Sequence, residues 1–233
     1  MKHLLTLYIL TFSYCTSKST NFQKNEIKKE LNIAEMIKVD FFRNSVPDSL
    51  KYLLPILDSV YVTEFRFRTV GDNKKFLDNK NEVLKNDKIN LAIVCPIIDK
   101  YGFLGFQDIG MFGATALFKV IQHSDSSTHI KYREKVRVAF LNKKITSSDY
   151  AMFEDRILKS QHKKQMFGTQ ILISQNASFI YPIYNVDSLE IRRNAIKLNE
   201  PYFNYCKRLK FNWNINTYKL YEDSLLKIFR IIN

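Results

Sequence analysis

The sequence predicts an α+β fold that is mainly α, a helical bundle with one β-hairpin packed against it. Most stretches repeat apolar residues at the three- and four-residue spacing of helices, whereas residues 165–183 alternate with a period of two. The 233 residues include only 6 Gly and 5 Pro, which is too few for a turn-rich sandwich or barrel. Since 45% of the residues are hydrophobic and 14% are aromatic, the chain can bury a sizeable core.

The chain is basic, with 36 Lys and Arg residues against 23 Asp and Glu residues and a formal net charge of +13. Such a balance favours anionic partners. The basic residues are scattered in pairs, however, and no nucleic-acid-binding motif accompanies them. We therefore interpret them as a solvated Lys-rich surface and expect no nucleic-acid partner, whereas an anionic small molecule or a glycan stays open as a partner.

Residues 1–20 have the pattern of a signal or lipoprotein segment. Lys2 and His3 precede an apolar run, residues 4–14, that is too short to span a bilayer but has the length of a signal-peptide core. Cys15 follows this run directly and is the candidate lipidation site, although bacterial lipoprotein signals prefer a small residue where Tyr14 stands. We expect export to the bacterial cell envelope or periplasm, with membrane association only through a lipidated N-terminus. If the segment is an ordinary N-terminal helix, the protein is cytoplasmic.

We expect a charged N-terminal helix in residues 21–47, a globular domain in residues 48–206 and a helical tail in residues 207–233. In the first part of the domain, an apolar helix is predicted over residues 50–70, with Pro55 kinking it or setting its start. Its polar residues Glu64, Arg66 and Arg68 are expected to pair along its surface. The stretches that follow are predicted to be a polar connector over residues 73–88, with room for a short helix, and an apolar helix over residues 89–101 that is interrupted near Cys95-Pro96. A helix buried nearly all round is predicted over residues 110–123.

The second part of the domain carries the period-two alternation. A basic amphipathic helix over residues 128–141 is followed by a helix over 149–161 that residues 146–149 should cap. Residues 165–183 are expected to form the hairpin, with a turn at 174–177 and an edge strand that carries Pro182. Further helices are predicted from a cap at Asp187 through Leu198, from Pro201 onwards, and over residues 217–232.

The sequence lacks the usual signatures of metal and cofactor sites. Cys95 and Cys206 are not part of a Cys-x-x-Cys pair, so they are expected either to pair in an oxidising compartment or to remain free and buried. No His-x-x-x-His, P-loop or dinucleotide-binding motif occurs. We therefore expect no metal and no cofactor.

Several short polar motifs occur in order along the predicted globular domain. They are Gln122-His123, Asp155-Arg156, Gln165, Phe167-Gly168-Thr169-Gln170, Asp187 and Arg192-Arg193. In this order they resemble a bacterial family known only as a domain of unknown function, over roughly residues 48–206. The family has a Gly-Trp-Pro-like loop where this chain has Gly102-Phe103-Leu104, and a Tyr where it has Phe167. The resemblance implies a shared fold and supplies no activity.

Two of these motif residues are candidates for acid–base catalysis. His123 could act as a general base and Asp155 as its acid partner, because an imidazole titrates near neutral pH. The alternatives are a helix-capping histidine and a structural ion pair of Asp155 with Arg192 or Arg193. Candidate ligand-binding residues are Gln122, Arg156, Gln165, Gln170, Arg192 and Arg193. Among these, Gln170 could instead be a core amide that holds the hairpin to a helix.

Two function classes follow. The first is a binding or structural module of the cell envelope, in which the polar residues fix the hairpin and helices. The second is a hydrolase-like enzyme acting on an anionic or phosphorylated substrate, with His123 and Asp155 as base and acid. The composition slightly favours the binding or structural module, because no feature of the composition needs catalysis to explain it. If the polar residues are buried and paired with one another, the structural interpretation gains.

Overall fold

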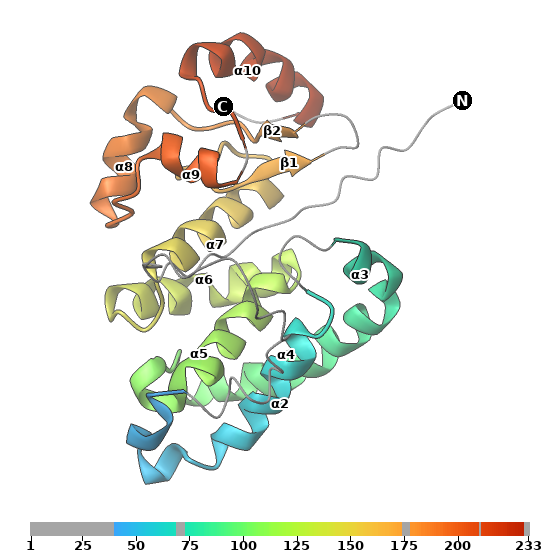
Figure 1. Ribbon diagram of the computed structural model, residues 1–233, viewed down its shortest axis with the longest axis vertical. Coiled ribbons are helices and arrows are strands. Elements are labelled where there is room, and N and C mark those ends of the chain that lie inside the picture. The colour runs from blue at the N-terminus through green and yellow to red at the C-terminus, as the bar shows by residue number, and fades with distance from the viewer. Residues whose placement is uncertain (1–39, 69–72, 174–177, 210, 231–233) are drawn as a thin grey trace, which may run out of the picture. The chain divides into compact units, whose positions relative to one another are not determined.

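The computed structural model describes residues 40–68, 73–173, 178–209 and 211–230, and these are mainly helical as predicted (Figure 1). The predicted signal segment with Cys15, most of the 21–47 helix and the 174–177 turn lie outside the described residues. The chain divides into two compact units at Ile145 and Thr146. We call the described residues 40–145 the N-terminal unit and 146–230 the C-terminal unit, so the predicted 48–206 domain spans parts of both.

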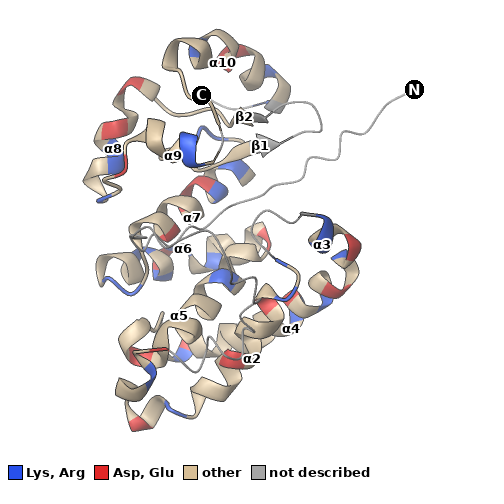
Figure 2. Ribbon diagram, viewed as in Figure 1, with Lys and Arg blue, Asp and Glu red and all other residues tan. Residues whose placement is uncertain are grey.

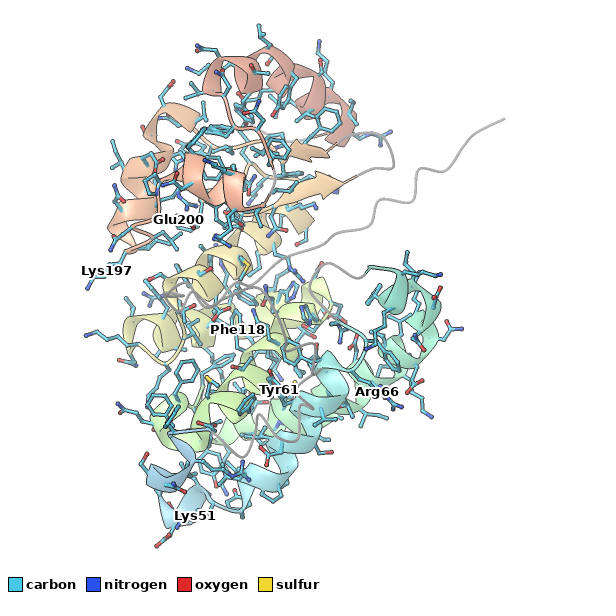
Figure 3. The ribbon with its side chains drawn as sticks, viewed as in Figure 1. Lys51, Tyr61, Arg66, Phe118, Lys197 and Glu200 are labelled. Atoms are coloured by element: carbon cyan, nitrogen blue, oxygen red, sulfur yellow. The ribbon has the colours of Figure 1, made fainter. Side chains whose placement is uncertain are left out.

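The N-terminal unit is built from helices. Short 3-10 helices at Arg43–Ser45 and Asp48–Leu50 precede α2 (Leu53–Phe65), α3 (Asn73–Asp78), α4 (Lys80–Tyr101), α5 (Phe106–His123) and α6 (Ser126–Leu141). Helices α2, α4 and α5 lie side by side (Figure 1). Tyr61 of α2, labelled in Figure 3, packs its ring edge-on against Phe112 of α5, with the ring centroids 4.8 Å apart. As predicted, α5 is buried nearly all round.

The predicted connector over residues 73–88 contains the short helix α3, but its second part is wrong, because α4 already begins at Lys80. Helix α4 also continues through Pro96, where an interruption was predicted. Its buried residues Val83, Val94 and Ile98 lie along one stripe, so burial against the neighbouring helices outweighs the weak local preference. Charged residues of both signs lie towards its two ends, and residues 89–98 between them carry no charge (Figure 2).

Helix α5 contains a kink at the position where the sequence predicted its start. Ile109 and Gly110 have non-helical backbone angles, with φ of +75° at Gly110. Buried Asp40 accepts hydrogen bonds from the next two main-chain N–H groups, Met111 at 2.6 Å and Phe112 at 3.3 Å. A Cβ atom on Gly110 would lie 2.6 Å from that carboxylate, so a glycine lets Asp40 approach and cap the second part of α5.

The C-terminal unit combines helices with two short paired strands. It contains α7 (Ser147–Ser160), β1 (Ile171–Ile173), β2 (Ser178–Ile180), a 3-10 helix at Val186–Ser188, α8 (Leu189–Ala195), α9 (Tyr202–Arg208) and α10 (Ile215–Phe229). The strands are antiparallel, with Ile171 opposite Ile180. Thr146 caps α7 as predicted, since its hydroxyl accepts a hydrogen bond from the N–H of Asp149 at 3.0 Å. Asp187 makes no side-chain cap to α8, contrary to prediction.

Residues 165–170 form a loop, although their alternating pattern predicted a strand. Gly168 has φ of +75°, which an extended strand does not allow. The tail helix α10 packs on its own unit, because the buried hydroxyl of Tyr218 accepts a hydrogen bond from the N–H of Ile183 at 2.6 Å. Within the described ranges, no helix is long and apolar enough to cross a membrane.

Candidate functional site

Asp155 of α7 is the centre of a buried polar cluster in the C-terminal unit. Its carboxylate is 0% exposed and accepts hydrogen bonds from the main-chain N–H groups of Met166 at 2.7 Å, Phe167 at 3.0 Å and Thr169 at 2.9 Å. The Thr169 hydroxyl donates a further bond at 2.8 Å. These partners are groups of the 165–170 loop, whereas the sequence suggested an ion pair with an arginine.

The environment of Asp155 acts on its proton affinity in two directions. Burial raises the pKa of Asp155 to about 6, and the hydrogen bonds from Thr169 and Phe167 oppose that rise. The hydrogen bonds therefore offset only part of the rise in pKa that desolvation of the carboxylate causes. Chemically, the group can anchor the loop and can also exchange a proton near neutral pH.

Gln165 holds the two sides of the loop together. Its Nε2 donates to the carbonyl oxygens of Gln170 at 3.1 Å and Tyr181 at 2.6 Å, and its Oε1 accepts from the N–H of Gln170 at 2.7 Å. Its side chain is fully buried, so the N–H of Gln170 and the carbonyl of Tyr181 would lose this partner without it, whereas the carbonyl of Gln170 also accepts from the N–H of Tyr181 at 3.0 Å. The side-chain amide of Gln165 thus links the main chain of Gln170 to that of Tyr181.

Gln170 points into the same cluster and ties the loop to α7. Its Nε2 donates to the carbonyl of Met152 at 3.4 Å and to the Thr169 hydroxyl at 3.3 Å. Its Oε1 is buried and makes no hydrogen bond to the described residues. The contact to Met152 agrees with the interpretation of Gln170 as a core amide that links the hairpin region to a helix.

Arg192 of α8 closes the cluster from the side. Its Nε donates to the carbonyl of Met166 at 2.9 Å, and its two terminal nitrogens donate to the carbonyls of Asn185 and Tyr184. The guanidinium therefore bridges the 165–170 loop and the segment that precedes α8. Each of the three guanidinium nitrogens donates a hydrogen bond to a main-chain carbonyl oxygen.

Arg193 is one of the largest fully buried side chains, at 1% exposed. It donates to the carbonyls of Phe167 at 2.8 Å and Glu200 at 3.2 Å, the latter labelled in Figure 3. Its guanidinium carbon also lies 5.1 Å from the ring centre of Tyr202 and 5.0 Å from that of Tyr205. Contacts with aromatic rings and main-chain oxygens compensate the cost of burying this charge.

Sequence reasoning missed Tyr202, the first residue of α9. Its hydroxyl donates to the carbonyl of Gly168 at 2.9 Å, and its N–H donates to the Glu190 carboxylate at 2.7 Å. A Cβ atom on Gly168 would lie 2.6 to 2.8 Å from three atoms of the Tyr202 ring and hydroxyl. The Phe-Gly-Thr-Gln motif therefore requires glycine because a buried tyrosine packs directly on the loop.

A second polar cluster lies in the N-terminal unit around His123, the last residue of α5. The Nδ1 atom of His123 lies 2.6 Å from Oε1 of Glu64 on α2. The Glu64 carboxylate also accepts from Arg68 at 2.8 Å and from Asn90 of α4 at 3.2 Å. The sequence placed Glu64 on the helix surface, but it is 1% exposed.

Arg68 links this cluster to α4. Its NH2 donates to both carboxylate oxygens of Asp87, at 2.6 and 2.7 Å. Burial alone would raise the pKa of Glu64, but hydrogen bonding and charge from His123 and Arg68 outweigh it and hold that pKa below its ordinary value. Glu64 is therefore ionised at neutral pH beside the imidazole.

Gln122 and Arg156, also predicted as ligand-binding residues, lie in different surroundings. Gln122 is buried, and its Oε1 accepts a hydrogen bond from Lys119 at 2.8 Å. Arg156 is half-buried on α7. Burial of Lys159 is the main cause that lowers the pKa of this lysine to about 8, and the positive charge of Arg156 adds to that effect. Cys95 and Cys206 are both free thiols.

The structure thus brings together one group of the predicted site residues. Asp155, Gln165, Gln170, Arg192 and Arg193 surround the 165–170 loop, whereas Gln122 and His123 belong to the N-terminal unit. Among the residues that the structure describes, no group of three His, Cys, Asp or Glu side chains could hold a metal ion.

Comparison with known proteins matches a large part of the chain to a family. A family model described as "Family of unknown function (DUF6624)" matches residues 78–217, which include His123, Asp155 and the whole 165–170 loop. No curated protein and no solved structure matches the chain. The match extends over well over half of the residues, in agreement with the predicted resemblance to a family of unknown function. The chain therefore belongs to the Family of unknown function (DUF6624).

Proposed function

We propose that the chain is a binding or structural module of the bacterial cell envelope. The observation that carries this proposal is how the motif side chains of the C-terminal unit are used. Asp155, Gln165, Arg192 and Arg193 all bond to main-chain groups of the 165–170 loop or of the segments beside it. Buried networks of this kind rigidify a segment and specify one conformation. They explain the motifs without a substrate.

We also infer that β1, β2 and residues 174–177 form a hairpin that packs on α7. The antiparallel register of Ile171 with Ile180 supports it, as does the bond from the Tyr181 N–H to the Gln170 carbonyl at 3.0 Å. The amide of Gln170 provides the link to Met152 of α7. A two-stranded ribbon is marginal alone in water, so a helix beside it is the expected support.

The envelope location rests on residues 1–20 as an export signal with Cys15 as the lipidated residue. The test is expression of the full chain in a bacterium that is fed radiolabelled palmitate. We expect label in the wild type and in Cys95→Ser, and none in Cys15→Ser. Absence of label from the wild type, together with its recovery in the cytoplasmic fraction, would contradict the proposal.

The role of the motif residues is tested by thermal unfolding with a panel of phosphorylated metabolites and glycans. If the cluster is structural, Gln165→Ala lowers the melting temperature by several degrees, since about 1 kcal/mol corresponds to roughly 2–4 °C in a chain of 233 residues. No phosphorylated ligand should then raise the melting temperature in a way that depends on His123. The structural role of the motif residues is refuted if His123→Ala is as stable as wild type and one ligand class stabilises the wild type alone.

A second candidate is a hydrolase-like enzyme acting on an anionic or phosphorylated substrate. In it, Asp155 would be the acid in the C-terminal unit, and His123 would be a base in the N-terminal unit. The arginines Arg156, Arg192 and Arg193 would hold the anionic group, and Gln122, Gln165 and Gln170 would contact the ligand. The observation that favours it is that burial raises the pKa of Asp155 to about 6, where a carboxyl group can act in acid–base catalysis.

This second candidate is tested by hydrolysis of a panel of phosphate esters and acyl esters. We expect activity in the wild type, loss of at least about 100-fold in Asp155→Asn, and no loss in Asp223→Asn, which changes an exposed carboxylate of α10. If the three proteins hydrolyse every ester at the same rate, the enzyme proposal is abandoned.

A further inference from the structure

We propose that Glu64 and His123 form an acid–base dyad in the N-terminal unit. In this dyad, buried Glu64 holds the Nδ1–H of His123, and Nε2 is the nitrogen that takes a proton from a bound water or hydroxyl group. The inference rests on the second function proposed above. It adds Glu64 as the positioning residue and does not depend on Asp155.

The geometry of the pair assigns different tasks to the two nitrogens of the ring. The Nδ1 atom lies 2.6 Å from the Glu64 carboxylate, and an ionised carboxylate can only accept a hydrogen bond. Nδ1 therefore carries the hydrogen, which leaves the lone pair of a neutral imidazole on Nε2. The Glu64 side chain is 1% exposed whereas that of His123 is 19% exposed, so the carboxylate lies on the inner side of the pair.

The surroundings keep Glu64 ionised and fixed. Arg68 donates to its Oε1 at 2.8 Å, and Asn90 donates to its Oε2 at 3.2 Å. Arg68 is itself held by Asp87, which bonds to it through both oxygens. A fixed negative charge beside Nδ1 stabilises the imidazolium that forms when Nε2 accepts a proton.

Other contacts already cap the end of α5 and join the end of α2 to α4, two structural tasks that the histidine could have. The hydroxyl of Ser124 donates to the carbonyl of Ile121 at 2.7 Å and thereby caps the end of α5. Arg68 connects α2 to α4 through Asp87. Neither the end of α5 nor the packing of α2 on α4 therefore requires the ring of His123 as a hydrogen-bond donor.

The step assigned to the dyad is one proton transfer. The O–H bond of the bound water or hydroxyl breaks, a bond between Nε2 and hydrogen forms, and the oxygen keeps the electron pair and becomes the nucleophile. Glu64 of α2 contacts the ring of His123 directly, Arg68, which follows α2, and Asp87 of α4 are linked to it through Glu64, and Asp125 and His129 follow His123 along the chain.

The first test is a pH titration of the full chain by NMR with nitrogen-15 in the histidine rings. In the wild type, we expect His123 in the Nδ1–H tautomer. In Glu64→Gln, its titration midpoint should fall by at least about one unit, a tenfold loss of proton affinity, because a neutral amide replaces the charge. The control Glu82→Gln removes an exposed glutamate of α4 and should leave the midpoint unchanged.

The second test needs no variant. Diethyl pyrocarbonate modifies an unprotonated, reachable imidazole nitrogen, and mass spectrometry of the digested protein identifies the modified residue. We expect His123 to react in the folded wild type, with exposed His162 as the internal reference. If His123 stays unmodified while His162 reacts, or if the wild-type ring carries its hydrogen on Nε2, the pair is a structural strut and the proposal is overturned. Neither readout depends on a substrate, so failure to find hydrolysis would bear on the proposed enzyme and not on the dyad.

Discussion

Replacement of Gly168 by alanine tests whether the close packing of Tyr202 on the 165–170 loop holds the C-terminal unit together. Gly168 has φ of +75°, a conformation that costs an alanine about 1–2 kcal/mol. The new Cβ would lie 2.6 to 2.8 Å from the Tyr202 ring and hydroxyl, which are fully buried and cannot simply move aside. Overpacking of this kind costs about 1–3 kcal/mol. We therefore expect Gly168→Ala to lower the free energy of unfolding by about 2–5 kcal/mol.

The assay is urea unfolding followed by the fluorescence of Trp213. It is the single tryptophan of the chain, and its ring centre lies 4.7 Å from that of Tyr202, so it reports on the C-terminal unit. Gly102→Ala is the matched control for backbone strain, because Gly102 also has positive φ but a Cβ atom added there would meet nothing within 4 Å. That control is followed by far-ultraviolet circular dichroism, since Gly102 belongs to the other unit.

A double variant separates the steric clash from the backbone strain. In a Tyr202→Leu background the ring atoms that meet the new Cβ are gone, so Gly168→Ala should cost only the strain of about 1–2 kcal/mol. If Gly168→Ala costs the same in both backgrounds, Tyr202 does not press on the loop. If it costs less than about 1 kcal/mol in the wild-type background, the explanation of the glycine in the motif is refuted.

Three further predictions follow from the buried groups. Gln165→Leu should cost about 3 kcal/mol, because the buried Gln170 N–H and Tyr181 carbonyl lose their partner, whereas exposed Gln107→Leu should change urea unfolding by less than about 0.5 kcal/mol. Burial would raise the pKa of Glu64, but the bonds of Glu64 to His123 and Arg68 hold that pKa below its ordinary value of 4.5. The ionised Glu64 therefore contributes stability above pH 4.5, and this contribution is lost as the pH falls through the lower pKa of the folded state. The melting temperature measured from pH 7 to 3 should therefore fall less in Glu64→Gln than in the wild type, and equal falls would contradict this. Burial raises the pKa of the Cys206 thiol to about 12, so iodoacetamide at pH 8 should label half-buried Cys95 before Cys206 until urea unfolds the protein, as mass spectrometry of the two peptides will show.

Local spacing along the chain was enough to predict most of the helices. The apolar periods anticipated α2, α5, α6 and α10, and the polar run at 146–149 anticipated the cap on α7. Such patterns are local, because a helix that buries one face must repeat apolar residues every three or four positions. Spacing failed at residues 73–88, where the local signal is polar and packing of α4 on its neighbours decides the outcome.

The motif residues illustrate what the sequence could propose but not resolve. It identified Asp155, Gln165, Gln170, Arg192 and Arg193 as polar groups that had to find partners, since burial without partners is costly. Their partners are main-chain groups, which carry no side-chain signature in a sequence. No pattern could therefore show that these residues surround one loop.

What the sequence determined by itself is the mainly helical class and the identity of the polar residues that interrupt apolar elements. The tertiary structure decided which of these residues meet. Glu64, Arg66 and Arg68 read equally well as a surface charge pattern, and only the packing of α2 against α4 and α5 turns Glu64 inward to His123. Likewise, only the approach of Tyr202 explains why residues 165–170 leave the extended conformation that their alternation suggested. Contacts between residues distant in sequence are set by the packing of whole elements, and that information is not local.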